Sequence, residues 1–314
     1  MSEKKQKKIT AQSFITMKKN GEKITVLTSY DYIMAKALDS AGIDALLVGD
    51  SMGMVIYGQN STLPVTVEDI LRHTQAVARG TNRSMVIADM PFMSFSTPDI
   101  ALKNAGRFIK EGNADAVKLE GGRERVKSIK MMIECGIPVM GHLGLTPQYI
   151  HQLGGYKLQG KNAHAAERLI EDALLLEEAG VFAIVLEMVP WQVAKEISSR
   201  IQIPTIGIGA GAYCDGQVLV AQDMMGFSDR KPFKFVKKYA DVWNIMVDAG
   251  KNYINDIKNG EFPAQTNSFE IPEDEYQMLK DSIEHNPKLK NTVHEEGNIH
   301  KKDKETDIGS IYSN

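Results

Sequence analysis

Acidic, basic and hydroxyl side chains follow a series of short apolar runs in this sequence, at the point where each run ends. These residues are Asp50, Ser51, Asp89, Lys118, Glu120, His142 and Glu187. A carboxylate at the end of a buried strand contributes little to stability, whereas in parallel α/β folds that end is where ligands bind. The set therefore predicts a polar site assembled from several strand ends.

Three of the carboxylates are candidates for holding a metal ion. Asp50, Asp89 and Glu120 end the second, third and fourth strands that we expect. Neighbouring strands lie about 4.8 Å apart, so the three backbones span roughly 10 Å and the side chains can converge on one ion. Several carboxylates in a semi-buried mouth cannot all ionise without compensation, and Lys118 supplies only one positive charge. Oxygen ligands without cysteine or clustered histidine favour Mg2+ over zinc.

Glu187 lies apart from these carboxylates, at the end of the sixth expected strand. In a closed barrel that strand is across the mouth from the second, third and fourth. This placement suits a base that acts on a substrate held by the metal. Lys118 and Glu120 are two residues apart on one strand, so both point to the same side.

Each residue also has a purely structural explanation. Asp50 or Asp89 alone can cap a helix, and Glu187 can cap the helix that follows it. Lys118 and Glu120 can form a structural ion pair, and His142 can be a buried histidine with satisfied hydrogen bonds. So many coincidences at corresponding strand ends are less plausible than one shared site.

The elements that must position these residues alternate regularly along the chain. Apolar runs read as strands, each followed by a helical pattern that stops near a glycine. The expected strands cover residues 24–28, 45–48, 85–88, 116–119, 137–140, 183–186 and 205–208, with an eighth within 218–225. About eight such units in about 250 residues predict a (β/α)8 TIM barrel. An open, doubly wound sheet is the alternative.

Segments at both ends of the chain flank this barrel. A helix over 10–19 precedes it, and one or two amphipathic helices are expected within 233–257. The remainder is polar, charged and poor in large apolar residues, so we expect it to be disordered. Tyr276, Leu279 and Ile283 can form one short amphipathic turn within it. We therefore divide the chain into a catalytic barrel domain, 1–269, and a polar C-terminal tail, 270–314.

Composition narrows the classes of function. The formal net charge of −3 gives no sign of nucleic acid or an anionic membrane as a partner. Only two cysteines, Cys135 and Cys214, are present, in no metal-ligand spacing, which favours a reducing cytoplasm. The basic start MSEKKQKKIT is not followed by an apolar run, so we expect no secretory signal. No apolar stretch approaches the roughly eighteen residues of a membrane span.

One further motif is weaker. The run from Gly207 to Gly211, GIGAG, resembles part of a dinucleotide fingerprint but follows a late strand and lacks the full spacing. It is better explained as a tight loop, or as an anion-holding turn near a helix start.

Taken together, longer motifs resemble a known family, the ketopantoate hydroxymethyltransferases (3-methyl-2-oxobutanoate hydroxymethyltransferases). The motifs are LLVGDSMGM, STLPVTVEDILRHTQAVARG, ADMPFMSF, AVKLEGG, PVMGHLGLTPQ, GGYKLQG, VLEMVP and IPTIGIGAG. The resemblance runs in order from residue 14 to residue 269 and does not extend into the tail.

The resemblance implies a TIM barrel with one Mg2+ per subunit at Asp50, Asp89 and Glu120. It also implies that Glu187 is the proton acceptor. The 2-oxo acid substrate is expected to be bound by these residues: Asp50, Ser51, Asp89, Lys118 and His142. The family transfers a one-carbon unit from 5,10-methylenetetrahydrofolate, the co-substrate, to 3-methyl-2-oxobutanoate. The product is 2-dehydropantoate, for pantothenate and coenzyme A synthesis. A homo-oligomer is implied, a decamer in bacterial members.

Two other functions fit a magnesium-binding barrel. One is a carbon–carbon lyase or mutase similar to phosphoenolpyruvate mutase and isocitrate lyase. Those enzymes carry a catalytic cysteine in a KKCGH-like run, and nothing in this sequence resembles it. The other is a non-catalytic barrel that binds metal or supports an assembly, in which a base opposite the metal would have no role.

Overall fold

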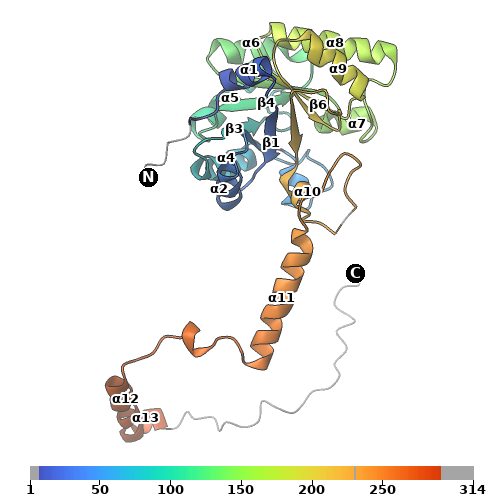
Figure 1. Cartoon of the computed structure of the whole chain (residues 1–314). Coiled ribbons are helices and arrows are strands. Elements are labelled where there is room, and N and C mark those ends of the chain that lie inside the picture. The colour runs from blue at the N-terminus through green and yellow to red at the C-terminus, as the bar shows by residue number, and fades with distance from the viewer. Residues whose placement is uncertain (1–6, 230, 291–314) are drawn as a thin grey trace. The chain divides into compact units, whose positions relative to one another are not determined.

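The computed structural model describes residues 7–229 and 231–290, and its centre is a closed barrel of parallel strands (Figure 1). The strands pair in sequence order, and β1 pairs with β8 to close the ring. They are β1 (Ile24–Thr28), β2 (Ala45–Val48), β3 (Met85–Asp89), β4 (Ala116–Glu120), β5 (Val139–Gly144), β6 (Ala183–Glu187), β7 (Thr205–Ile208) and β8 (Gly216–Leu219). The closed ring confirms the TIM barrel and excludes an open sheet.

Helices connect each strand to the next as far as β7 and cover the outside of the barrel (Figure 1). The α-helices up to the last strand are α1 (Ala11–Asn20), α2 (Tyr32–Ser40), α3 (Met52–Val55), α4 (Val67–Gly80), α5 (Pro98–Lys110), α6 (Val126–Glu134), α7 (Ile150–Leu153), α8 (Ala163–Glu178) and α9 (Trp191–Arg200). Short 3-10 helices η1 (Arg123–Arg125) and η2 (Pro147–Tyr149) precede α6 and α7, and α10 (Ala221–Met225) follows β8. Residues 209–215, which join β7 to β8, are all described and contain no helix.

Burial explains why the strand sequences are continuously apolar. Every residue of β2, β3 and β4 is buried, as expected for parallel strands covered on both faces. One core cluster lies between the barrel and its helices, and a second fills the barrel. Phe14 of α1 belongs to the second cluster and packs edge-on against Phe182, with ring centroids 5.6 Å apart.

Helix starts follow side-chain capping rules. Thr10 and Thr66 each form a capping box with the third residue of their helix, and Thr97 accepts a hydrogen bond from the Ile100 backbone N–H. Gly21 ends α1 in the left-handed conformation, which confirms the predicted stop.

The predicted bounds of three elements differ from the structure by two residues or more. The fifth strand begins at Val139 and not at residue 137, since Pro138 has no N–H to donate to a neighbouring strand. It runs on to Gly144, so His142 lies inside a strand. The eighth strand starts at Gly216, two residues before the predicted segment 218–225, most of which is helix α10. The helix expected from residue 233 begins at Val242.

Aspartates precede three strands at the amino-terminal end of the barrel, and each accepts a hydrogen bond from a backbone N–H of the neighbouring strand. Asp44 accepts from Thr25, Asp115 from Val86 and Asp215 from Thr205, at 2.8–3.0 Å. Each aspartate also forms an ion pair with a different basic residue, at 2.8–3.0 Å. Asp44 pairs with Arg83, Asp115 with Lys8 and Asp215 with Lys18. Every one of these charges therefore has a local partner.

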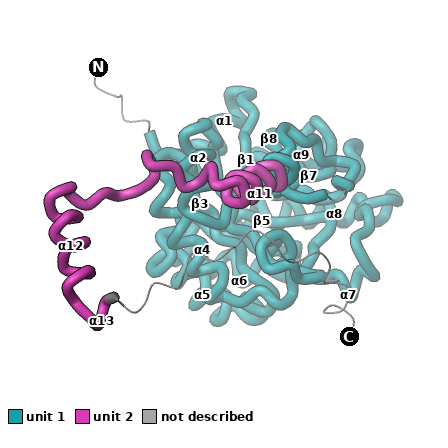
Figure 2. Tube along the Cα trace, turned by 90° about the horizontal axis from the view of Figure 1, so that it is seen from below, with its two compact units in different colours: residues 1–246 teal, residues 247–314 magenta. Residues whose placement is uncertain are grey.

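The chain divides into two compact units, residues 1–246 and 247–314, coloured separately in Figure 2. The boundary falls within α11 (Val242–Asn259); η3 (Gln265–Asn267), α12 (Glu273–His285) and α13 (Pro287–Lys290) follow. Part of the tail that we expected to be disordered is thus helical, and Tyr276, Leu279 and Ile283 lie in α12. Three acidic residues in the first turn of α12 favour its start. Residues 291–314 of the tail, and the first six of MSEKKQKKIT, lie outside the described residues.

Within the described ranges, every helix is too short or too polar to traverse a lipid bilayer. Both cysteines are free thiols, Cys135 exposed and Cys214 buried.

Candidate active site

Carboxylates from neighbouring strands meet at the carboxyl end of the barrel. Asp89 and Glu120 are the last residues of β3 and β4, and Asp50 follows β2 by two residues. Asp89 is in register with Lys118 of β4, and Glu120 is in register with His142 of β5. All of these side chains are buried. The structure therefore brings together the residues that the strand-end pattern singled out.

Lys118 pairs across the strands with Asp89, at 2.6 Å from Nζ to Oδ1, so the Lys118–Glu120 ion pair considered above is not the one that forms. Burial disfavours the ammonium charge, but the surrounding carboxylates Asp89, Glu120 and Asp50 outweigh it and raise the pKa of Lys118. Lys118 is therefore a fixed positive charge of the site. The second oxygen of Asp89, Oδ2, accepts a hydrogen bond of 3.3 Å from the backbone N–H of Asp50.

Gln148, in η2, is a site residue that our sequence reasoning missed. Its side-chain Nε2 donates to Asp50 Oδ2 and to the carbonyl oxygen of Met90, both at 2.9 Å. Its backbone N–H donates to Glu120 Oε2 at 3.1 Å. Gln148 lies within the quoted motif PVMGHLGLTPQ, but it carries no charge and does not end a strand, so neither of our criteria selected it.

Tyr30 was missed as well. Its hydroxyl lies 2.8 Å from Ser51 Oγ, and the phenol is fully buried. Burial is the main reason that the pKa of Tyr30 lies above its usual range, with the charges of Asp50 and Asp89 adding to it. Tyr30 comes two residues after β1, so extending the strand-end search to the first strand would have found it.

The buried carboxylates resist ionisation. Burial, followed by the charge of Asp89, raises the pKa of Asp50 to about 7, against the lowering effects of Lys118 and Gln148. Burial, followed by the charge of Asp50, raises the pKa of Glu120 well above its usual range. Around Lys118 there are three carboxylates and one ammonium, so full ionisation leaves an excess of two negative charges.

Glu187, at the end of β6, faces His142. Its Oε2 lies 3.3 Å from His142 Nε2, although the two groups do not meet hydrogen-bond geometry. Burial holds the pKa of His142 well below its usual value, with Lys118 acting in the same direction, so the imidazole is neutral. Burial raises the pKa of Glu187 to about 7, against the lowering effect of Lys118. Its side chain is 18% exposed, the most open of the four carboxylates.

The backbone around Glu187 is tightly constrained. Gly144 has a φ of +96°, and a Cβ there would clash with the carbonyl oxygen of Glu187. That oxygen accepts from the Leu145 N–H at 2.8 Å. On the other side, Met188 has a φ of +48°, unusual for a residue with a side chain, and its N–H donates to Ile208 at 2.9 Å. Such a conformation beside a candidate base is typical of functional sites.

The helix-capping explanations do not hold. Helix α3 has Ser51 at its N-cap and α9 has Pro190, and neither start has a side-chain capping bond. Asp50 and Glu187 are therefore not caps. The glycine run at 207–211 begins in β7 with Gly207 and continues into the loop toward β8, where Gly209 and Gly211 have positive φ; no helix follows it before β8.

The donor set fits a divalent cation by charge and chemistry. Asp89 Oδ1 is buried, and the Lys118 ammonium at 2.6 Å compensates it, so that one positive charge is shared among three buried carboxylates. In residues 7–229 and 231–290, no three potential ligand side chains already converge on one point. An ion held by Asp50, Asp89 and Glu120 would therefore require side-chain rotation, while supplying the two positive charges that the cluster lacks.

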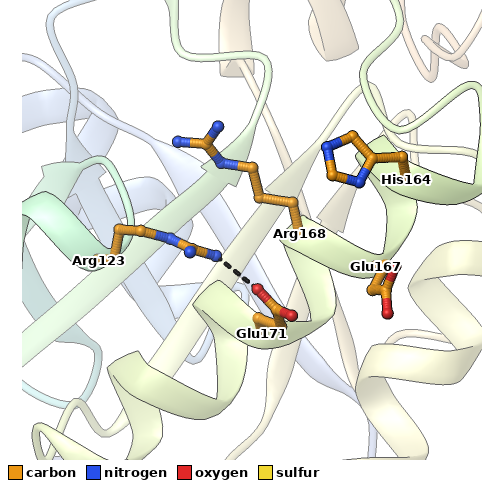
Figure 3. A pocket seen from close by; sticks show the side chains of 5 residues that line it. All are labelled: Arg123, His164, Glu167, Arg168 and Glu171. Carbon is orange, nitrogen blue, oxygen red and sulfur yellow. Dashed lines mark hydrogen bonds and ion pairs between the residues drawn. The ribbon is translucent and has the colours of Figure 1, made fainter.

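A separate pocket on the outer surface has a different character (Figure 3). It is lined by Arg123, His164, Glu167, Arg168 and Glu171. Arg123 pairs with Glu171 at 2.9 Å and with Asp172 at 2.6 Å, and both ends of the Arg123–Glu171 pair are well exposed. The residues that line this pocket are all exposed, and their opposite charges compensate one another in contact with solvent, so the pocket offers no buried charge for chemistry.

Most of the chain, including the residues of this site, is similar in sequence to one family of known proteins. The sequence profile of the family described as ketopantoate hydroxymethyltransferase matches residues 8–265. A 3-methyl-2-oxobutanoate hydroxymethyltransferase of Syntrophus aciditrophicus (strain SB) is 56% identical over 269 residues, covering 85% of this chain and 99% of its own. The enzyme of the same name from Clostridium botulinum (strain Loch Maree / Type A3) is 55% identical, covering 84% and 97%.

Solved structures share the fold at low identity. A phosphonopyruvate hydrolase is 12% identical with a TM-score of 0.55, covering 87% of this chain and 96% of its own. A 2,3-dimethylmalate lyase, described as a member of the PEP mutase/isocitrate lyase superfamily, is 16% identical with a TM-score of 0.53, covering 87% and 96%. At such identities the likeness is one of barrel architecture alone.

Proposed function

The chain belongs to the ketopantoate hydroxymethyltransferase family, an enzyme family, and we propose that it transfers a one-carbon unit from 5,10-methylenetetrahydrofolate to 3-methyl-2-oxobutanoate. The product would be 2-dehydropantoate, which feeds pantothenate and coenzyme A synthesis. The observation that carries this proposal is the pairing of a buried, under-compensated carboxylate cluster with a fourth carboxylate, Glu187, whose pKa is near neutrality.

Asp50, Asp89 and Glu120 would hold one Mg2+ per subunit. Their oxygens are the ligands that this cation prefers, and their excess negative charge matches its valence. When bound, the ion supplies Lewis-acid polarisation of the substrate's 2-oxo group and carboxylate.

Glu187 acts as the general base in this proposal. With a pKa of about 7 it is ionised in a useful fraction at neutral pH and is basic enough to accept a proton from C3 of the substrate. Removing that proton leaves an enolate, whose C3 forms a bond to the methylene carbon of the folate co-substrate. Both C–N bonds of that carbon break with their electron pairs going to the two folate nitrogens, and water supplies the hydroxyl group of the product, so that tetrahydrofolate is released. Neutral His142 lies beside Glu187 and adds no positive charge that would lower its basicity.

Lys118 and Ser51 position the substrate. The permanently charged Lys118 ammonium attracts the 2-oxo acid carboxylate, and the Ser51 hydroxyl, held by Tyr30, offers a hydrogen bond at the same mouth. With Asp50, Asp89 and His142 they would form the wall around the 2-oxo acid.

Three further parts of the proposal concern the whole chain. The family match ends at residue 265, which supports a catalytic domain of 1–269 followed by a separate tail, 270–314. Two free cysteines support a cytoplasmic location, with small molecules as the only substrates and no nucleic acid or membrane partner. A homo-oligomer, a decamer by family resemblance, is supported by exposed apolar side chains on α11, including Ile245 and Tyr253.

Proton exchange tests the proposed function. The protein is incubated with 3-methyl-2-oxobutanoate in D2O, with Mg2+ or with EDTA, and the C3 proton is followed by NMR. We expect exchange that depends on Mg2+ and is lost in Glu187→Gln. The matched control is Glu171→Gln, which removes an exposed surface carboxylate and should leave exchange intact. Adding methylenetetrahydrofolate should then yield 2-dehydropantoate.

The same assay separates the alternatives. A lyase or mutase would break or rearrange a carbon–carbon bond of its substrate without needing folate, and a non-catalytic barrel would show no exchange in folded protein. Absence of exchange with and without Mg2+ would overturn the proposed function. Neither cysteine is placed for lyase chemistry, because Cys135 follows α6 at the end remote from the site and Cys214 is buried in the β7–β8 connection.

A further inference from the structure

Gln148 contacts the ends of all three strands that carry the proposed metal ligands. Its side-chain Nε2 reaches Asp50 beyond β2 and the carbonyl of Met90, the residue after Asp89 at the end of β3. Its backbone N–H reaches Glu120 at the end of β4. That N–H lies in the first turn of η2, where backbone donors have no partner within the helix and are free to bind a carboxylate.

The orientation of the Gln148 amide is fixed by its partners. Asp50 Oδ2 and the Met90 carbonyl are both acceptors, so the NH2 group must face them, and the reverse orientation would oppose oxygen to oxygen. The remaining amide oxygen, Oε1, is buried without a donor, and the residue is only 3% exposed. A buried glutamine with an unpaired oxygen is costly, which suggests that its place is set by the site it supports.

We propose that Gln148 is the positioning residue of the cation site, holding one oxygen each of Asp50 and Glu120 while their other oxygens turn toward the ion. The inference rests on the proposed function, because it assumes that these carboxylates bind Mg2+. Hydrogen bonds to a ligand's outer oxygen fix its orientation, and losing such a partner typically weakens metal affinity by about 10–100-fold. Its unpaired Oε1 is also a suitable acceptor for a water carried by the cation, since Mg2+ usually keeps several.

The side-chain and backbone contacts of Gln148 can be separated by mutation. Gln148→Met keeps the length and bulk but removes both N–H donors, while the backbone bond to Glu120 remains. Gln148→Asn keeps the amide but shortens the side chain by one methylene, so it cannot span Asp50 and Met90 together. The matched control is Gln222→Met, because Gln222 is also buried with an unpaired Oε1, yet its amide contacts the Met34 sulfur and no carboxylate.

The experiment measures metal binding without turnover. Full-length wild-type protein and the three variants are stripped of divalent ions, checked for folding by circular dichroism, and titrated with Mn2+ while free Mn2+ is followed by EPR. We expect the Kd for Mn2+ to rise about 10–100-fold in Gln148→Met and Gln148→Asn, and to change less than about 3-fold in Gln222→Met. The substrate KM of the two Gln148 variants should be close to the wild-type value at saturating Mg2+, because excess metal fills a site whose affinity for the metal is weakened.

The possible results distinguish the positioning role of Gln148 from the proposed function on which it rests. If wild-type protein binds Mn2+ and catalyses exchange, and a folded Gln148 variant binds Mn2+ equally well, the positioning role is overturned while the proposed function stands. If wild-type protein neither binds Mn2+ nor exchanges the C3 proton, both are overturned. If Gln148→Met fails to fold, the Kd of Gln148→Asn for Mn2+ decides between the same two results.

Discussion

The two ends of the barrel use the same residue types in opposite ways. At the amino-terminal end, Asp44, Asp115 and Asp215 each have a backbone donor and a basic partner of their own. At the carboxyl end, three carboxylates share one lysine, and burial and mutual repulsion raise the pKa of Asp50 to about 7. The first arrangement stabilises the contacts between strands and loops, whereas the second leaves negative charge uncompensated and able to bind a ligand.

The difference lies in compensation and not in residue type. An aspartate whose oxygens are satisfied locally has no remaining capacity for chemistry, so it contributes to stability alone. An under-compensated cluster costs stability in the free protein, and binding a cation or substrate removes that cost. Substitutions at the two ends should therefore have opposite effects on activity and on the free energy of unfolding.

The largest expected effect is that of Glu187→Gln. We expect C3 proton exchange to fall by about 10²–10⁴-fold, the usual contribution of a general base. At pH 8 the free energy of unfolding should rise by about 1–3 kcal/mol, because the variant no longer buries a charge whose pKa burial has raised. NMR exchange and chemical denaturation measure the two quantities. A loss of both activity and stability would contradict the functional assignment.

Asp44→Asn should give the reverse pattern. The change breaks a pair with Arg83 at 2.8 Å and weakens the acceptor for the Thr25 N–H. We expect the free energy of unfolding to fall by about 2–4 kcal/mol, with exchange activity of the folded protein unchanged. Urea denaturation and the NMR assay at 25 °C check this. Lost activity in fully folded protein would show that the two ends are not independent.

The pH dependence of exchange should follow Glu187. Its pKa is raised to about 7, so the base is protonated below that pH and the rate should fall about tenfold per pH unit there. In ion-free protein, by contrast, the free energy of unfolding should be larger at low pH and should fall as the pH rises. The raised pKa values of Glu187 and Asp50 favour folding below about pH 4, and that advantage is lost as pH rises through about 7. Exchange rates and melting curves from pH 5 to 8.5 test both. An exchange rate that stays constant from pH 8.5 down to pH 5 would contradict the first.

The smallest effect is expected at the surface pocket. Glu171→Gln removes one partner of the exposed Arg123, which keeps its shorter contact with Asp172. We expect the free energy of unfolding to change by less than about 1 kcal/mol and exchange activity to stay the same. A clear loss of activity would assign this pocket a role that its compensated charges do not indicate.

Much of this arrangement was predictable from the sequence because the strands are short, buried and separated by clear helix stops. The carboxyl-end rule selected Asp50, Asp89, Glu120 and Glu187 without knowledge of their contacts. It could not show that Lys118 pairs with Asp89 and not with Glu120, since that choice depends on the register between β3 and β4.

Gln148 shows the limit of reasoning from residue type. A neutral side chain in a turn carries no signal of its own, and its importance arises only from the three strand ends that converge on it. Tyr30 shows a different limit, since it could have been found by treating β1 like the other strands. The β5 boundary moved because Pro138 cannot donate a hydrogen bond, a rule that was available in advance.

The backbone constraint around Glu187 has a consequence for the speed of proton transfer. Gly144 and Leu145 hold its carbonyl oxygen from one side, and Met188 anchors the next residue to Ile208 on the other. The main chain therefore leaves this carboxylate only rotation about its own side-chain bonds. Torsional jumps of exposed side chains take picoseconds to nanoseconds, and loop rearrangements take far longer; Glu187, with 18% of its side chain exposed, is the most open of the four carboxylates. Glu187 can reorient between substrate and solvent without waiting for any segment of the chain to open.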